Sequence, residues 1–139
     1  MSFRKILVAI DQSLLSSIVL EQALDYALKD GAKLMAFHCI NSGTLSDLPP
    51  HLYFEVETEK AQEWLQPYCQ KAADQGTPVE CVVEVGQPGP SICDLAERWS
   101  ADLIILGRRN QTGLTRLLLG SVSNHVVHHA PCSVLVLHG

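Results

Sequence analysis

The sequence predicts an α/β domain built on an open, parallel, five-stranded sheet with helices on both faces. Five short apolar runs alternate with segments whose apolar residues recur every three or four positions. Continuous apolar runs are typical of strands buried on both faces, and the longer spacing is typical of amphipathic helices. Their alternation favours parallel strands joined by right-handed helical crossovers. With 139 residues, the chain fits one domain over residues 1–139.

The first strand and helix are expected before residue 32. Residues 4–10 form an apolar run that is rich in branched side chains and ends at Asp11. The helix that follows has Gly31 placed as its C-terminal cap. Its apolar positions are Leu20, Ala23, Leu24, Ala27 and Leu28.

A second strand at residues 33–40 leads into a polar, proline-containing surface loop at residues 41–50. The next helix ends at Gly76 and contains Pro67. Because proline removes a helical hydrogen bond and clashes with the preceding turn, we expect a kink at residues 63–67 or two abutting segments. The apolar positions of this helix are Ala61, Trp64, Leu65, Tyr68, Cys69, Ala72 and Ala73.

In the second half of the sequence, three apolar runs predict strands at residues 78–85, 102–106 and 132–137. A turn at residues 87–90 begins a short helix that has Pro90 near its first turn. Its apolar face comprises Ile92, Leu95, Ala96 and Trp99. The last helix has Ser121 as its expected N-cap and ends before Pro131. The positions spaced for burial in this helix are Val122, Val126, Val127 and Ala130.

Composition limits the function classes. The formal net charge is −5 and the isoelectric point is near 5.6, so we expect no nucleic-acid partner. No apolar run approaches the roughly 20 residues of a membrane span, and the chain begins with a strand instead of a signal peptide, so a cytoplasmic protein is expected. The five cysteines form no CxxC pair, which favours buried free thiols over disulfides or zinc ligands.

Residues 106–132 place a strand end, a polar loop and a helix start in succession. A helix N-terminus offers unpaired N–H groups and positive potential, and glycines let a phosphate approach the backbone. Arg108, Arg109 and Arg116 concentrate positive charge here in an acidic chain. In parallel sheets, ligands bind at the carboxyl ends of strands, where Asp11, Cys39 and Gly107 are expected. This pattern predicts a phosphate site.

The same stretch carries a family resemblance. Its spacing resembles the G-x2-G-x9-G-[ST] loop of the universal stress protein family, with Gly107 first and Gly120-Ser121 last. The words TGLTRLLLGSVSNHVVHHAPCSVLVL resemble the family's C-terminal block, and the likeness extends through VAID near the start. The chain is most similar to the ATP-binding subgroup of UspA-type domains. The resemblance implies a Rossmann-like fold, similar to that of adenine nucleotide alpha hydrolases, and a regulatory role in stress response.

The resemblance also implies a nucleotide site for ATP or AMP. Asp11 would contact the ribose, and the backbone near Cys39 would contact the adenine. The backbone N–H groups of Gly107, Gly120 and Val122 would contact the phosphates. Ser121 and Ser123 could add hydroxyl groups. The residues expected at the nucleotide are Ala9, Ile10, Asp11, Cys39, Leu106, Gly107, Arg108, Arg109, Asn110, Gly120, Ser121, Val122 and Ser123.

Several alternatives remain open from the sequence. Asn110 stands where the pattern has its second glycine, which leaves a dimeric interaction module that binds no nucleotide as a second hypothesis. Asp11 could cap the following helix instead of binding ribose. His125 and His129 have the spacing of helical zinc ligands, yet no acidic or cysteine partner lies nearby in the sequence, which favours surface histidines. His38, inside an apolar strand, is expected to be a core histidine with a hydrogen-bond partner.

We expect Mg²⁺ to accompany ATP, because adjacent phosphates repel unless a hard cation bridges them. The sequence shows no positioned general base, so it predicts slow ATP hydrolysis at most. An ATP pyrophosphatase or nucleotidyl transferase would need a glycine-serine loop after the first strand or an HIGH-like motif, and neither is present. Strand 132–137 is expected to pair with its copy in a homodimer, as in family dimers.

Overall fold

The computed structural model describes residues 2–11, 15–108 and 120–138, with Arg108 described by its backbone alone. Strands and helices alternate along these residues, as the sequence predicts. In chain order the elements are β1 (Lys5–Ala9), α1 (Leu15–Asp30), β2 (Lys33–Asn41), α2 (Pro50–Asp74), β3 (Val79–Gly86), α3 (Pro88–Trp99), β4 (Leu103–Arg108), α4 (Ser121–His129) and β5 (Ser133–His138).

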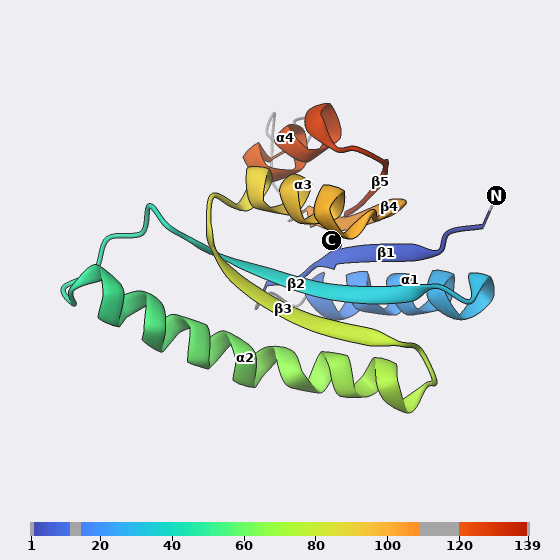
Figure 1. Ribbon diagram of the computed structural model, residues 1–139, viewed down its shortest axis with the longest axis horizontal. Coiled ribbons are helices and arrows are strands. Elements are labelled where there is room, and N and C mark those ends of the chain that lie inside the picture. Colours follow the sequence, from blue (N-terminus) through green and yellow to red (C-terminus); the bar gives the residue numbers. More distant parts are fainter. Residues whose placement is uncertain (1, 12–14, 109–119, 139) are drawn as a thin grey trace.

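The five strands form one parallel sheet in the order β3-β2-β1-β4-β5. Helices α1 and α2 cover one face of this sheet, and α3 and α4 cover the other (Figure 1). The strand order reverses between β1 and β4, which lie side by side although β2, β3 and three helices separate them in the sequence. The predicted three-layer α/β fold is confirmed.

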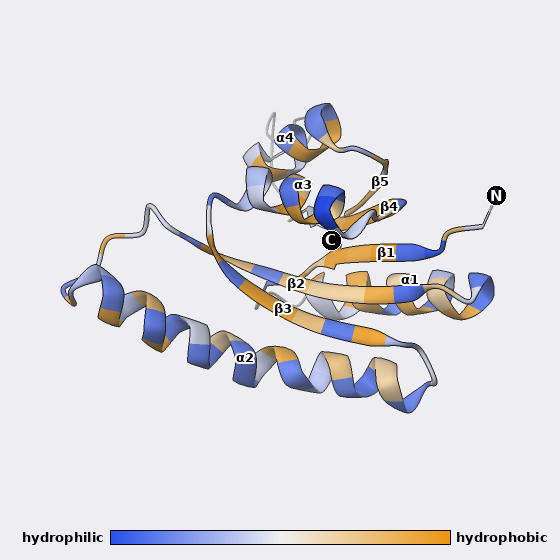
Figure 2. Cartoon of the chain, viewed as in Figure 1, coloured by the Kyte–Doolittle hydropathy of each residue, from blue (hydrophilic) through white to orange (hydrophobic). Residues whose placement is uncertain are grey.

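Burial follows directly from the apolar runs. Strand β1 is hydrophobic over most of its length, whereas α2 shows hydrophilic and hydrophobic patches in alternation (Figure 2). Within β1, Ile6 and Val8 face the α1/α2 layer and Leu7 faces the α3/α4 layer, and all three are fully buried. A strand that is buried on both faces cannot alternate polar and apolar residues, which explains its continuous apolar run.

The carboxylate of Asp102 holds β1 beside β4. Its two oxygens accept hydrogen bonds from the backbone N–H groups of Arg4 and Lys5, at 2.8 and 3.1 Å. The Asp102 N–H in turn donates to the Lys5 carbonyl at 2.9 Å. The Lys5 ammonium also donates to the Trp99 carbonyl at 3.1 Å. These contacts fix the register of the two central strands at their amino ends.

Helix α2 differs from the prediction. It is one helix over Pro50–Asp74 that contains Pro67, so the prediction of two segments is wrong. Packing of its second half against the sheet, where Leu65 and Ala72 are fully buried, offsets the hydrogen bond that proline removes. Its first turns, which the sequence did not indicate, extend beyond β2 and β3 (Figure 1). Their apolar residues Leu52, Tyr53, Phe54 and Val56 are exposed or half-buried, so these turns add nothing to the buried core.

Two local predictions need correction. The N-cap of α4 is Gly120 instead of Ser121, because Gly120 is extended (φ −65°, ψ 165°) and its carbonyl accepts the first helical bond, from Asn124 N–H at 2.8 Å. The predicted apolar faces are also too wide. Val127 and Leu28 are 45% and 49% exposed, because each lies at the margin of its helix's buried face.

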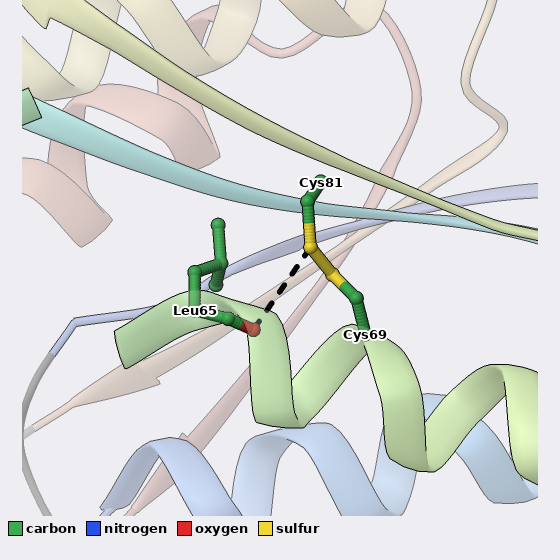
Figure 3. Close-up of a disulfide and its surroundings, with 3 residues drawn as sticks. All are labelled: Leu65, Cys69 and Cys81. Atoms are coloured by element: carbon green, nitrogen blue, oxygen red, sulfur yellow. Dashed lines mark hydrogen bonds between the residues drawn. A yellow bond between two sulfur atoms is a disulfide. The ribbon is translucent and has the colours of Figure 1, made fainter. Parts of the chain in front are cut away.

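The prediction of free cysteines is wrong for one pair. Cys69 on α2 and Cys81 on β3 form a disulfide, with a Cα–Cα distance of 6.2 Å (Figure 3). The chain reverses between α2 and β3, which returns Cys81 to the helix that carries Cys69; spacing in the sequence does not show this. The other three cysteines, Cys39, Cys93 and Cys132, are free thiols, as predicted.

The reversal between α2 and β3 generates a stability prediction. The Thr77 side chain there is 4% exposed, and its hydroxyl has no hydrogen-bond partner among the described residues. Replacing it with a methyl group of similar shape in Thr77→Val should raise the free energy of unfolding by about 1 kcal/mol, because a buried hydroxyl without a partner costs about 1–3 kcal/mol. Urea denaturation measures the change; a loss of stability would show that the hydroxyl has a partner.

Candidate functional site

A cavity of about 350 Å³ opens at the carboxyl ends of β1, β2 and β4, on the edge of the sheet where the sequence places its candidate site. This volume lies within the range of small-molecule sites. The position is the point at which the strand order reverses, where the crossovers on either side leave a crevice. Its described lining residues are Ala9, Ile10, Asp11, Leu15, Ser16, Val19, Phe37, His38, Cys39, Pro88, Ile92, Leu106, Gly107, Gly120, Ser121, Val122 and Ser123.

Asp11 supplies a carboxylate to this cavity, and Ser16 holds it in place. The Ser16 hydroxyl accepts a hydrogen bond from the Asp11 N–H at 2.9 Å and lies 3.0 Å from Asp11 Oδ1. It also lies 2.6 Å from the Asp11 carbonyl, and its one proton can be donated either to this carbonyl or to Oδ1. Ser16 is 3% exposed, so these bonds are shielded from water. Asp11 is therefore tied to the first turn of α1 and also lines the cavity. Whether it caps the helix or binds ribose stays a prediction.

The backbone of Ile10 is held on both sides. Its N–H donates to the Phe37 carbonyl at 2.8 Å, which extends the pairing of β1 with β2 by one residue. Its carbonyl lies 2.8 Å from His38 Nδ1, which identifies the protonated ring nitrogen as Nδ1. The His38 ring also makes an edge contact with Trp64 of α2, with centroids 4.7 Å apart. The prediction that His38 has a hydrogen-bond partner is confirmed, and the residue is also part of the cavity wall.

Gly107 allows α1 to approach the end of β4. A Cβ atom at this position would lie 2.7 Å from Leu15 Cδ2 and 2.8 Å from Val19 Cγ2. Contacts this short require a neighbour to move. The absence of a side chain at Gly107 therefore fixes how closely the first turns of α1 pack against the cavity floor.

The N-terminus of α4 forms the polar end of the cavity. Gly120 is the N-cap, and no side chain of the described residues caps the helix. The first N–H groups of a helix have no intrahelical partner, so those of Ser121, Val122 and Ser123 are available for an anion. Ser123 is 5% exposed, which places one of the two hydroxyl groups of this turn in a nearly dry position. The opposite part of the cavity is lined by the apolar side chains of Ala9, Phe37, Ile92 and Leu106.

Cys39 lines the apolar part. Burial raises the pKa of its thiol above the ordinary value of 9.0, and a hydrogen bond with Ser91 opposes this shift. The thiol is therefore neutral near pH 7. A neutral thiol behaves here as a small apolar surface and not as a nucleophile.

Ten of the thirteen residues predicted from the sequence line the cavity. Arg109 and Asn110 lie outside the described residues, and Arg108 ends β4 with no described side chain. Seven further lining residues are not among those predicted: Leu15, Ser16, Val19, Phe37, His38, Pro88 and Ile92. The positions of Phe37 and His38 beside Cys39 could have indicated them, whereas Pro88 and Ile92 are brought in by α3, which only the tertiary structure shows.

The described residues contain no group of three or more His, Cys, Asp or Glu that could hold a metal ion. The His125 and His129 rings stack with centroids 4.2 Å apart, and His129 Nδ1 lies 2.9 Å from the His125 carbonyl. The His125 ring also packs against Gly89 of α3. Within the described ranges, none of the helices is both long and apolar enough to cross a membrane.

Comparisons with known proteins agree with this architecture. The model of the universal stress protein family matches residues 2–138. The universal stress protein Sll1388 of Synechocystis is 41% identical over 152 residues, which cover 99% of both chains. The structure of UspA from Lactobacillus plantarum superposes with a TM-score of 0.84 at 25% identity and covers 99% of both chains.

A third similar protein has been solved with a nucleotide. The universal stress protein from Archaeoglobus fulgidus in complex with dAMP superposes with a TM-score of 0.70, and the match covers 98% of both chains. The sequence identity is 24%, so this likeness shows a shared fold.

Replacing the two glycines at the cavity with alanine should change the free energy of unfolding by different amounts. Gly107→Ala should lower the free energy of unfolding by about 1–3 kcal/mol, because the new methyl group overlaps the side chains of α1. Gly120→Ala should change it by less than about 1 kcal/mol, because no described atom lies within 4 Å of a Cβ added there and the backbone angles suit alanine. Thermal unfolding of both variants measures this; equal losses would contradict the close approach at Gly107.

Proposed function

The chain belongs to the universal stress protein family, and from this premise we propose that it binds an adenine nucleotide, ATP or AMP, in the cavity between β1, β4 and α4 as a regulator of stress response. One observation carries the proposal. A single cavity joins an uncapped helix N-terminus, a carboxylate and an apolar wall. An adenine nucleotide presents the matching groups in series, namely phosphates, ribose hydroxyls and an aromatic base.

The phosphates would lie at the N-terminus of α4. Gly120 adds no side chain there, so an oxygen can approach the N–H groups of Ser121, Val122 and Ser123. The Ser121 and Ser123 hydroxyls add two further donors. Arg108 and Arg109 follow the end of β4 and are proposed to supply positive charge, and Asn110 completes the predicted loop.

The nucleoside would lie towards β1 and β2. The Asp11 carboxylate, anchored by Ser16, would accept hydrogen bonds from the ribose hydroxyls. Ala9, Cys39 and Leu106 would enclose the adenine, with edge contacts to backbone near Ile10 and Cys39. The Archaeoglobus protein crystallised with dAMP supports this choice of ligand class.

Regulation is the better account than dedicated catalysis. The cavity's carboxylate, Asp11, is held by Ser16, and the Cys39 thiol is kept neutral by burial. Neither arrangement activates a water molecule for attack on a phosphate. Bound Mg²⁺ would screen the phosphate charges of ATP. We propose slow hydrolysis at most, and a signalling role for the bound state in the cytoplasm.

Calorimetric titration with ATP and with AMP, each with and without Mg²⁺, tests the proposal. The chain should bind nucleotide saturably, whereas Gly120→Asp should abolish binding, because the new carboxylate caps the N–H groups and repels phosphate. The same variant should gain roughly a few tenths of a kcal/mol in free energy of unfolding, because an aspartate caps a helix slightly better than a glycine. Loss of binding without loss of stability would locate the phosphates at this helix end.

Gly120→Ala is the matched control and should retain binding. Unchanged binding by Gly120→Asp would contradict the site. If the natural chain does not bind but Asn110→Gly does, the asparagine blocks the loop, and the second hypothesis, a dimeric interaction module, takes its place.

A homodimer through β5 is compatible with either hypothesis. Strand β5 is an edge of the sheet, and its four central residues, Val134–Leu137 in sequence, are only half-buried although all are apolar. Apolar edge strands invite pairing with a second copy, and a two-fold dimer places the same surface on both sides.

Leu137→Lys should therefore shift dimers to monomers in sedimentation equilibrium, because the ammonium groups would enter an apolar contact from both copies. Val85→Lys is the matched control: it alters a 42% exposed residue of β3, the opposite edge of the sheet. The control should leave the dimer intact. A monomer in the natural chain, or equal dissociation by both variants, would contradict assembly through β5.

A further inference from the structure

The Cys69–Cys81 disulfide joins two elements of unequal exposure. Cys69 lies on the buried face of α2 and is 7% exposed, whereas Cys81 lies on the edge strand β3 and is exposed. The bond therefore connects the buried face of α2 to a strand residue that is itself exposed (Figure 3). Exposed disulfides are the ones that thiols attack most readily, whereas buried structural disulfides resist exchange.

Both redox states have a place for the Cys81 side chain. Its sulfur lies 3.9 Å from the Leu65 carbonyl, within the reach of a thiol hydrogen bond (Figure 3). In the reduced state, the Cys81 thiol can donate to this carbonyl, one turn before Cys69 on the same helix. Reduction therefore requires no rearrangement of β3, and it replaces a covalent bond between α2 and β3 with a weak hydrogen bond.

The same stretch of α2 also contacts a residue of the cavity wall. Trp64 precedes Leu65, and its ring meets the edge of the His38 ring at a centroid distance of 4.7 Å. His38 bonds the Ile10 carbonyl at 2.8 Å, and both residues line the cavity. A short series of contacts thus joins the disulfide to the cavity wall.

We propose that Cys69 and Cys81 form a reversible thiol–disulfide exchange site, entered through Cys81, whose oxidised state holds α2 and the His38 wall of the cavity in place. The coupling to the cavity rests on the proposed nucleotide function. The exchange itself does not.

The exchange partner is a low-molecular-weight thiol and its disulfide, such as reduced and oxidised glutathione. On oxidation, the Cys81 thiolate attacks the small disulfide and releases one thiolate. The Cys69 thiolate then attacks Cys81 Sγ in the mixed disulfide and releases the second. Two protein thiols and one small disulfide become one protein disulfide and two small thiols. Reduction is the reverse, with attack at the sulfur of Cys81, the more exposed of the two residues.

The exchange is tested in glutathione buffers of varied ratio, without denaturant, followed by alkylation and peptide mass spectrometry. Cys69 and Cys81 should interconvert fully and together across these buffers. Cys81→Ser should abolish this titration, whereas Cys132→Ser, which alters a free cysteine outside the cavity lining, should leave it unchanged. Two results would overturn the proposal. One is that reduced glutathione opens the disulfide only after the protein is denatured; the other is that oxidised glutathione leaves Cys69 and Cys81 as thiols.

The coupling is tested by calorimetry with ATP and by hydrogen exchange of residues 61–73 in oxidised and reduced protein. Reduction should weaken nucleotide binding about five- to tenfold, the lower part of the range of allosteric couplings, and should speed exchange in α2. Cys81→Ser should match the reduced protein in both buffers, because a serine hydroxyl can also donate to the Leu65 carbonyl.

Identical hydrogen exchange in the two redox states would overturn the coupling. A chain that binds no nucleotide in either state would instead overturn the proposed function, and hydrogen exchange would still decide whether the disulfide holds α2. If reduction speeds hydrogen exchange in α2 but leaves the nucleotide affinity unchanged, the disulfide stabilises α2 alone. That result would overturn its link to the cavity.

Discussion

The pairing of β1 with β4 at the centre of the sheet is the constraint on which the rest of the site depends. Ile6, Leu7 and Val8 pair with Leu103, Ile104 and Ile105, and Asp102 fixes the register from the amino ends. Because the strand order reverses here, α1 and α4 lie on opposite faces of the sheet, and a crevice opens between their first turns. The carboxylate of Asp11 and the N–H groups of α4 meet in one cavity only because these two strands are neighbours.

The close approach at Gly107 links packing to ligand binding. The glycine allows Leu15 and Val19 to lie against the strand end, which keeps Ser16 within reach of Asp11. Gly120 acts differently: no described atom lies within 4 Å of a Cβ added there, and its lack of a polar side chain leaves the N-terminus of α4 without a cap of its own. The two glycines of the loop pattern therefore have different roles. Gly107 allows close helix packing, and Gly120 leaves the N-terminus of α4 accessible.

The sequence predicts those features that depend on local pattern. The apolar runs of β1 and β4 identify a parallel sheet, and the Gly107 to Ser121 spacing identifies the edge at which the cavity lies. Features that depend on tertiary contacts are absent from the pattern. The first turns of α2 contain no buried residue, and Pro67 suggests a break that the continuous helix does not have. Cys69 meets Cys81 only because the chain reverses between α2 and β3. The contribution of α3 to the cavity wall likewise follows from its packing against α4.

Backbone amide chemical shifts recorded during a titration with ATP and Mg²⁺ test the central claim most directly, because they report contact residue by residue. The account predicts that the largest shifts fall on Ser121, Val122 and Ser123, with smaller shifts at Asp11 and Cys39, while the projecting first turns of α2 stay unchanged. Shifts centred on another surface, or no shifts at millimolar nucleotide, would contradict a nucleotide site at this edge of the sheet.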